Sequence, residues 1–239
     1  MTEQDEKKRK FLVDALTLGL FAGVGTAGVL NPAFGLSGLP DRLPKGQSIY
    51  RLSGEVLVDG RPADLKTRVN PGSVIRTGAD GEIVFVVASD AFILRANSEV
   101  QLTASGLLIQ SMRIISGALL GVFGKRDDGH RIETSVATIG IRGTGIYIES
   151  GKDKTYACTC YGRTRISPNA NPSLITDVET SHHDMPLYIV SEPVRGKFVF
   201  PAPVINHSDQ ELALIEALVG RKTPFAQTGY GLQGNGGGY

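Results

Sequence analysis

The residues most able to carry chemistry lie in "KTYACTCYG" (residues 154–162), which holds both cysteines of the chain, Cys158 and Cys160. A second stretch, "SHHDMPLYI" (181–189), places His182 beside His183, two of the four histidines. Two thiolates and two imidazoles form the tetrahedral set that Zn²⁺ prefers, and this set also suits other soft or borderline ions. The two stretches therefore predict a site for zinc, iron or haem.

The spacing decides which histidines can take part. The Cys-x-Cys pair is tighter than the Cys-x₂₋₄-Cys of zinc fingers, so the chain has no finger motif here. Neighbouring residues of a strand face opposite ways, so only one of His182 and His183 can easily reach the thiols. His207, just before a predicted helix, is the candidate for the fourth ligand. The intervening "SPNANPSLITD" is long enough to fold back toward the cysteines.

A disulfide is one alternative for the two cysteines. Residues i and i+2 of a strand lie about 6.6 Å apart along it, whereas the Cβ atoms of a disulfide lie about 3.8 Å apart. A bridge within the chain therefore requires a distorted strand or a loop. A bridge between two chains stays open, because the compartment predicted below is oxidising.

The cysteines could instead be buried core residues or part of a catalytic pair. In the first case both are small buried hydrophobes, with the histidine pair in a solvated loop. In the second, Cys160 with His182 or His183 would form a nucleophile and base. However, no nucleophile-elbow or papain-like sequence surrounds them. We therefore do not expect an enzyme.

The N-terminal segment, residues 1–36, has the pattern of an export signal. Four basic residues end "MTEQDEKKRK", and no charge occurs from Ala15 to Leu36. The segment resembles a secretory signal peptide, and uncleaved it is about long enough to span a bilayer. In both cases the basic flank stays inside and the remainder is exported. This predicts a periplasmic or cell-envelope protein, with an inner-membrane anchor if the segment is kept.

Composition and charge indicate a folded protein that does not bind nucleic acid. The net charge is +1, from 25 basic and 24 acidic residues, and gives no argument for binding nucleic acid. Hydrophobic residues make up 41% of the chain and glycine is frequent, which indicates a folded, turn-rich protein. The length suits one main domain with appendages.

Short strands separated by turns are predicted from residue 48 to residue 166. "GEVLVDG" alternates apolar and polar residues and ends in Asp59-Gly60, a tight-turn pair. Comparable runs follow, among them "SVIRTGADGEIVFVV" and "RIETSVATIGIRGTGIYIES". Many short strands at regular spacing predict an all-β domain, as a sandwich, barrel or solenoid.

A helix is predicted late in the chain, over residues 208–219. Ser208 is the N-cap and Glu211 follows three residues later, which makes a capping box. Gly220 and Pro224 are stop signals. We expect this helix to pack on the β domain, within a C-terminal extension over 167–224. Residues 225–239 form a Gly-rich tail that we expect to be disordered.

The most specific stretch is "SVATIGIRGTGIYIE" (135–149), with Arg142 inside a β-rich run full of glycine. Here the chain resembles the FecR-type domain of the bacterial envelope, whose signature is "T-x-x-A-x-x-G-x-R-G-T-x-F/Y". Two earlier pieces, "VNPGSVIRTGADGEIVFVV" and "AFILRANSEVQL", are also similar to that family. The residues that fit the signature are Thr134, Ala137, Gly140, Arg142, Gly143, Thr144 and Tyr147.

The resemblance implies an exported, all-β, solenoid-like or sandwich-like domain over about 48–149. It leads us to expect a non-catalytic module that binds or scaffolds other envelope proteins. A metal- or haem-binding periplasmic protein is the first alternative. The second is a signal-sensing regulator of the sigma-regulator type. The resemblance implies that sigma regulators of this family carry a cytoplasmic N-terminal domain. The ten residues before the apolar segment are too few to fold into such a domain, which counts against this second alternative.

Overall fold

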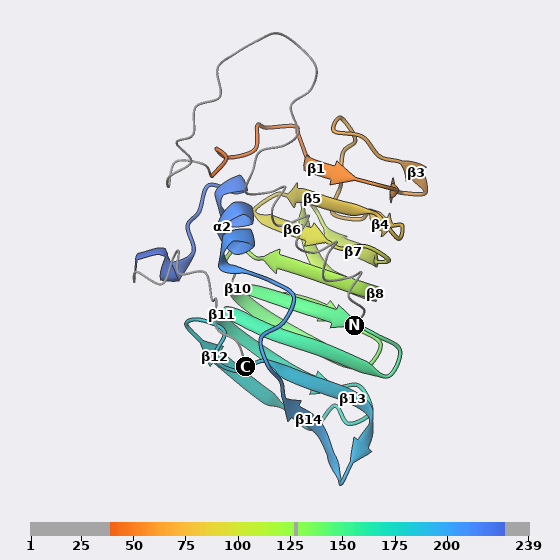
Figure 1. Ribbon diagram of the computed structural model, residues 1–239, viewed down its shortest axis with the longest axis vertical. Coiled ribbons are helices and arrows are strands. Elements are labelled where there is room, and N and C mark those ends of the chain that lie inside the picture. The colour runs from red at the N-terminus through yellow and green to blue at the C-terminus, as the bar shows by residue number, and fades with distance from the viewer. Residues whose placement is uncertain (1–38, 127–128, 228–239) are drawn as a thin grey trace, which may run out of the picture. The chain divides into compact units, whose positions relative to one another are not determined.

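The computed structural model describes residues 39–126 and 129–227 (Figure 1). Within these ranges the chain is mostly β-sheet, with a single α-helix near its C-terminal end. The elements are β1 (Ile49–Ser53), β2 (Val56–Val58), β3 (Arg61–Pro62), β4 (Val74–Thr77), β5 (Glu82–Val87), β6 (Asp90–Leu94), β7 (Glu99–Ser105), β8 (Leu108–Val122), β9 (His130–Glu133), β10 (Ala137–Ser150), β11 (Lys154–Pro168), β12 (Thr176–Thr180), β13 (Leu187–Val194), β14 (Lys197–Pro201), α2 (Asp209–Leu218) and the 3-10 helix η1 (Pro224–Gln227).

The strands form one 14-stranded sheet whose central path runs β14-β13-β11-β10-β9-β8-β7-β4-β2-β3. β1, β5 and β6 join it through β8, and β12 joins it through β11. All pairings are antiparallel except that between β8 and β9. In Figure 1, β1 and β3 lie at the top, β8, β10 and β11 in the middle, and β13 and β14 at the bottom. The long strands β8, β10 and β11 therefore form the middle of the sheet.

Turn chemistry sets several of the hairpins. Asp59 and Gly60 both have positive φ, 52° and 76°, between β2 and β3. Two consecutive positive φ values define the type I′ turn that Asp-Gly favours. The tight turn predicted from this pair is confirmed.

Side chains of the central strands alternate between two buried clusters. On β10, Ile146 and Ile148 belong to the larger cluster, and Tyr147 belongs to a second one. On β11, Ala157 lies in the larger cluster, and Cys158 and Cys160 lie in the second. This alternation follows from the two-residue period of a strand. It puts the two cysteines on one face of the sheet.

The helix α2 covers part of that second cluster. Leu212, Ile215 and Leu218 are buried within it, and α2 packs against β6 and β8. The N-cap Ser208 accepts a hydrogen bond from the backbone of Glu211, whose side chain accepts one from the backbone of Ser208. The predicted capping box and the predicted C-terminal helix are thus confirmed.

The β-rich region extends further than the sequence indicated. β12, β13 and β14 follow residue 166, where the predicted strands ended. The mainly β fold with one C-terminal α-helix is confirmed at this level. The predicted export segment, 1–36, lies outside the described residues. Of the tail predicted over 225–239, residues 225–227 belong to η1, with Phe225 buried, and residues 228–239 lie outside the described residues. Within the described ranges, no helix is long and apolar enough to cross a membrane.

Candidate metal centre

The cysteines stand side by side along β11. Tyr147 of β10 is the register partner of Cys158. Both thiols are fully buried, and both are free cysteines. Thr159, between them, faces the other way and bonds the hydroxyl of Thr164 at 2.7 Å. The strand therefore presents two sulfur atoms on the face that α2 partly covers.

His183 reaches the cysteines from the turn after β12. Its φ is 55°, in the left-handed region. In this conformation the backbone N–H of His183 donates to the carbonyl of Cys160 at 3.0 Å. The His183 ring then lies with Nδ1 3.4 Å from the sulfur of Cys158.

His207 arrives on the connection between β14 and α2, which crosses the face of β11 and β10 in Figure 1. The hydroxyl of Tyr156 holds this connection: it donates to the carbonyl of Pro203 at 3.0 Å and accepts from the N–H of Ile205 at 3.3 Å. The His207 ring stacks on Tyr147, with centroids 4.7 Å apart. The connection is therefore held on the sheet just before His207 and at the His207 ring itself.

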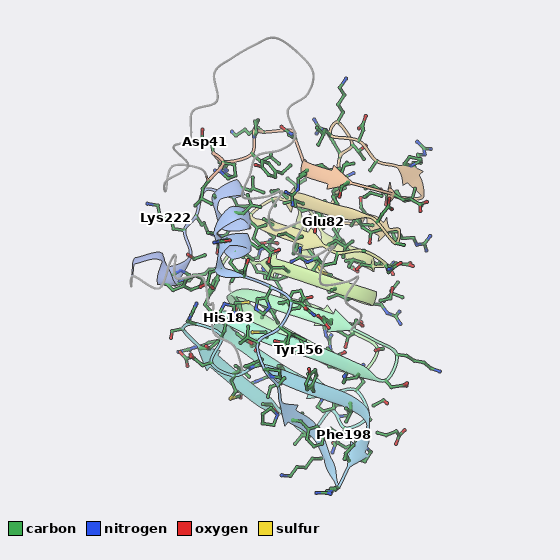
Figure 2. The ribbon with its side chains drawn as sticks, viewed as in Figure 1. Asp41, Glu82, Tyr156, His183, Phe198 and Lys222 are labelled. Carbon is green, nitrogen blue, oxygen red and sulfur yellow. The ribbon has the colours of Figure 1, made fainter. Side chains whose placement is uncertain are left out.

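Four donor atoms converge in this way. The sulfurs of Cys158 and Cys160 and one ring nitrogen each of His183 and His207 all lie within 4.8 Å of one another. Nε2 of His207 is 3.0 Å from Nδ1 of His183. Figure 2 shows His183 and Tyr156, both labelled, over the middle strands of the sheet. Residues that are distant in sequence thus form one compact cluster of two sulfur and two nitrogen donors.

The outward hydrogen bonds of the two rings fix where their protons lie. Nδ1 of His207 is 2.6 Å from the carbonyl oxygen of Ile205, which can only accept, so Nδ1 carries the proton. Nε2 of His183 is 3.0 Å from the carboxylate of Asp209, which makes it the donor as well. In the neutral rings, the two nitrogens that face each other therefore both present lone pairs. Such a pair at 3.0 Å needs a cation or a shared proton between them.

His182 lies outside the four-donor cluster. Its Nε2 is 2.8 Å from the second oxygen of Asp209, and its ring packs edge-on against Phe225. It forms a neighbouring group with His183 and Asp209. The sequence did not single out Asp209. Its one signal was its place in the first turn of the helix, where an acidic residue also suits the helix dipole.

Hydrogen bonding in the cluster separates the pKa values of the thiols. The pKa of Cys158 is lowered to about 3, first by its hydrogen bond with Cys160 and also by His183 and His207, against the effect of burial. Burial raises the pKa of Cys160, and the neighbouring Cys158 adds to this. For His183, burial opposes the charged form, but hydrogen bonds with Cys158 and Asp209 outweigh it and raise its pKa. The cluster therefore favours a thiolate at Cys158 beside an imidazolium.

Tyr147 is the one signature residue that contacts this cluster, through its stacking on His207, and the exposed part of the signature lies elsewhere. Gly140 and Arg142 line a cleft of about 710 Å³ on the exposed side of β10, β11 and β12. Arg142 is exposed, and Gly143 has a φ of 56° at a bulge in β10. The hydroxyl of Thr144 donates to the carbonyl of Arg163 at 3.0 Å. These residues contribute no donor atom to the cysteine and histidine cluster.

Comparisons with known proteins give few matches. No protein-family model and no curated protein matches the chain. Two crystal structures of a "putative anti-sigma factor" from Parabacteroides distasonis are similar to it at 8% and 9% identity, with TM-scores of 0.44 and 0.43. Each match covers 54% of this chain and 58% of the other. The chain thus aligns with little more than half of the length of those structures.

Proposed function

We propose that this protein binds one transition-metal ion, foremost Zn²⁺, between Cys158, Cys160, His183 and His207. The observation that carries the proposal is the pair of imidazole nitrogens that face each other at 3.0 Å, while the other nitrogen of each ring donates outward to Asp209 or to the carbonyl of Ile205. Two thiols complete the set within 4.8 Å. An ion at the centre would replace the protons that the cluster otherwise has to share.

The dimensions suit a tetrahedral ion. Zinc bonds of about 2.3 Å to sulfur and 2.0–2.1 Å to nitrogen place two nitrogens about 3.3 Å apart, and a sulfur and a nitrogen about 3.6 Å apart. The corresponding separations here are 3.0 Å, between the His183 and His207 nitrogens, and 3.4 Å, between Cys158 and His183. These two separations would widen by a few tenths of an ångström around the ion, and the other pairs of donor atoms lie within 4.8 Å.

The outer contacts also suit a metal. Metal-bound histidines usually donate their second N–H to a carboxylate or a backbone carbonyl. His183 has Asp209 in that position, and His207 has the carbonyl of Ile205. Both rings thus have the partner that orients an imidazole toward an ion.

The donor types favour zinc or iron over other groups. Ca²⁺ and Mg²⁺ take oxygen ligands, whereas two sulfurs and two nitrogens in a tetrahedral set suit zinc and related ions. A haem supplies four nitrogens of its own and needs one or two axial ligands. Four protein donors within 4.8 Å leave no space between them for a porphyrin. The haem alternative is therefore the weaker one.

The ion would have a structural role. Four protein ligands fill a tetrahedral site, whereas a catalytic zinc keeps one position open for water or substrate. We accordingly propose a non-catalytic protein. Its ligands join the sheet, through Cys158 and Cys160, to two later parts of the chain, through His183 and His207. Metal binding would then stabilise the fold of the C-terminal part.

We further infer that the protein is an exported, FecR-type module that binds or scaffolds other envelope proteins. The support is the sequence signature around Arg142 and the basic and apolar pattern of residues 1–36. A role as a sigma-regulator-type sensor remains the second candidate, on the same resemblance. The metal centre is compatible with either, because it lies apart from the exposed signature residues.

Elemental analysis of the full-length protein, purified without a tag or chelator, tests the metal proposal. We expect about one zinc or iron per chain. Cys158→Ser and Cys160→Ser should each lose most of it, because a hydroxyl is a poor replacement for a thiolate ligand. Thr159→Ser is the matched control on the same strand and should retain the metal. Equal metal contents in the wild type and the double serine variant would overturn the proposal.

A further inference from the structure

The proposed metal ligands lie next to the N-terminal end of α2 and contact it. His207 is followed directly by Ser208, the N-cap, and by Asp209, the first residue of the helix. Asp209 accepts hydrogen bonds from both His182 and His183. The N-terminal end of α2 is therefore attached to the metal ligands both through the chain and through a side chain.

The other end of α2 is held by contacts that involve no ligand. The carboxylate of Glu216 bonds the hydroxyl of Tyr161 and the guanidinium of Arg221. The carbonyl of Leu218 accepts from the N–H of Leu43 at 3.0 Å. These contacts stay in place whether or not the four donor atoms hold an ion.

Between these ends, α2 and the connection before it cover apolar surface. Leu212 and Ile215 are fully buried against the second cluster of the sheet, which includes Tyr147 and Tyr156. Without an ion, the connection keeps the hydrogen bonds of the Tyr156 hydroxyl and that of Asn206 with Glu149 at 2.6 Å. The ion would add bonds from the sheet cysteines to His207 itself.

We propose, on the basis of the metal site above, that the ion is a latch for one end of α2. When it is bound, residues 203–212 are held on the sheet. When it is lost, this end keeps the hydrogen bonds of Tyr156 and Asn206 and the ion pair of Arg95 with Glu211, but it opens more often than the Glu216 end, which stays attached. Metal availability would thereby control exposure of the apolar face around Tyr147 and Tyr156, which makes the site regulatory as well as structural.

Hydrogen–deuterium exchange on the full-length protein, with Zn²⁺ and with a chelator, tests this proposal. Local opening increases amide exchange in the segment that opens. We expect chelation to raise exchange rates at least about 10-fold over 203–212. Peptides from β5 and β6 (82–94), and from the end of α2 (215–221), should change much less. Tyr161→Phe is the matched variant: it should raise exchange at 215–221 and leave metal content unchanged.

The outcomes separate the two proposals. If the protein binds zinc but exchange over 203–212 does not respond, the latch is wrong and the metal site stands. If exchange rises equally over the whole chain, the ion is a general stabiliser and the latch is also wrong. If the wild-type protein binds neither zinc nor iron, both proposals fail together.

Discussion

His183 has a backbone conformation that is uncommon for a residue with a side chain, with φ at 55°. A left-handed conformation costs about 1–2 kcal/mol for such a residue, and it persists where surrounding contacts determine it. Here the N–H of His183 bonds the carbonyl of Cys160, and its ring lies between Cys158 and Asp209. This conformation turns His183 toward the thiols, whereas His182 faces Asp209 and Phe225.

Replacing the two neighbouring histidines singly should have unequal effects on zinc affinity. His183→Ala removes a ligand, and we expect affinity to fall more than about 100-fold, beyond the usual loss of an outer contact. His182→Ala removes an outer contact only, and we expect a loss of about 10-fold or less. Competition titration against a zinc-chelating dye measures both. Equal losses would contradict the assignment of His183 as the ligand.

Asp209 should tune the site without binding the ion. Asp209→Ala removes the acceptor that orients the His183 ring, so zinc affinity should fall about 10- to 100-fold while metal still binds at saturation. Asp177→Ala is the control, since Asp177 pairs with Arg165 on an exposed face. It should bind zinc as tightly as the wild type. An unchanged affinity in Asp209→Ala would remove this residue from the centre.

The sequence named all four donor residues but could not choose between the adjacent histidines. Strand alternation predicted that only one of them would face the cysteines, and the structure gives that outcome through a turn conformation instead. A positive φ at His183 has no signal in the sequence, because it depends on contacts with the separate strand β11. Asp209 was missed for the same reason: its partners lie in another loop.

At the scale of single elements, glycine residues allow the irregular part of strand β10. Its first half pairs with β9 and its second half with β8, and the register shifts between Arg142 and Gly145. Gly143, in the left-handed region, forms the bulge at this shift. The hydroxyl of Thr144 closes it against β11. The signature stretch is therefore explained as architecture that lets one strand serve two neighbours.

Alanine at Gly145 should destabilise the protein. A Cβ atom there would lie 2.4 Å from the ring of Tyr161, which is buried and bonded to Glu216. Overpacking of this kind costs about 1–3 kcal/mol. Gly140→Ala is the matched control on the same strand, because its Cβ would meet its nearest neighbour at 3.8 Å. Urea unfolding compares the two variants, and equal stabilities would contradict this account of β10.

The elements were predictable where local chemistry specifies them. The helix followed from the Ser208 and Glu211 capping box, and the hairpin at Asp59-Gly60 followed from its turn pair. The strands after residue 166, β12 to β14, were not predicted from the sequence. Residues 167–224 were expected to form an extension with one helix, whereas the structure continues the sheet there and places Pro193 at an irregular part of β13. Proline is accepted at such positions in a sheet.

At the scale of the whole molecule, the site depends on pairings between distant parts of the chain. β11 pairs with β10, β12 and β13, so the chain returns to the cysteine strand twice after leaving it. The first return brings His183, and the connection after β14 brings His207. No local pattern predicts these returns, because they result from the register of long-range pairs. The candidate ligand residues could therefore be predicted from the sequence, but the strand pairings that bring them together could not.

The cellular location is a prediction for the whole chain. The basic and apolar pattern of residues 1–36 leads us to expect export, with the N-terminus inside. A reporter enzyme that is active only outside the cytoplasm, fused after the last residue of the full chain, should be active in intact cells. The same fusion without residues 1–38 should be inactive. An inactive full-length fusion, with the protein present, would overturn the predicted location.

X-ray absorption at the zinc edge of the full-length protein tests the central claim, a tetrahedral centre of two cysteines and two histidines, most directly. It measures the number, type and distance of the ligand atoms. We expect two sulfurs at about 2.3 Å and two nitrogens at about 2.0–2.1 Å. A shell of nitrogen and oxygen alone, or of six ligands, would contradict the assignment of Cys158, Cys160, His183 and His207 as the metal centre.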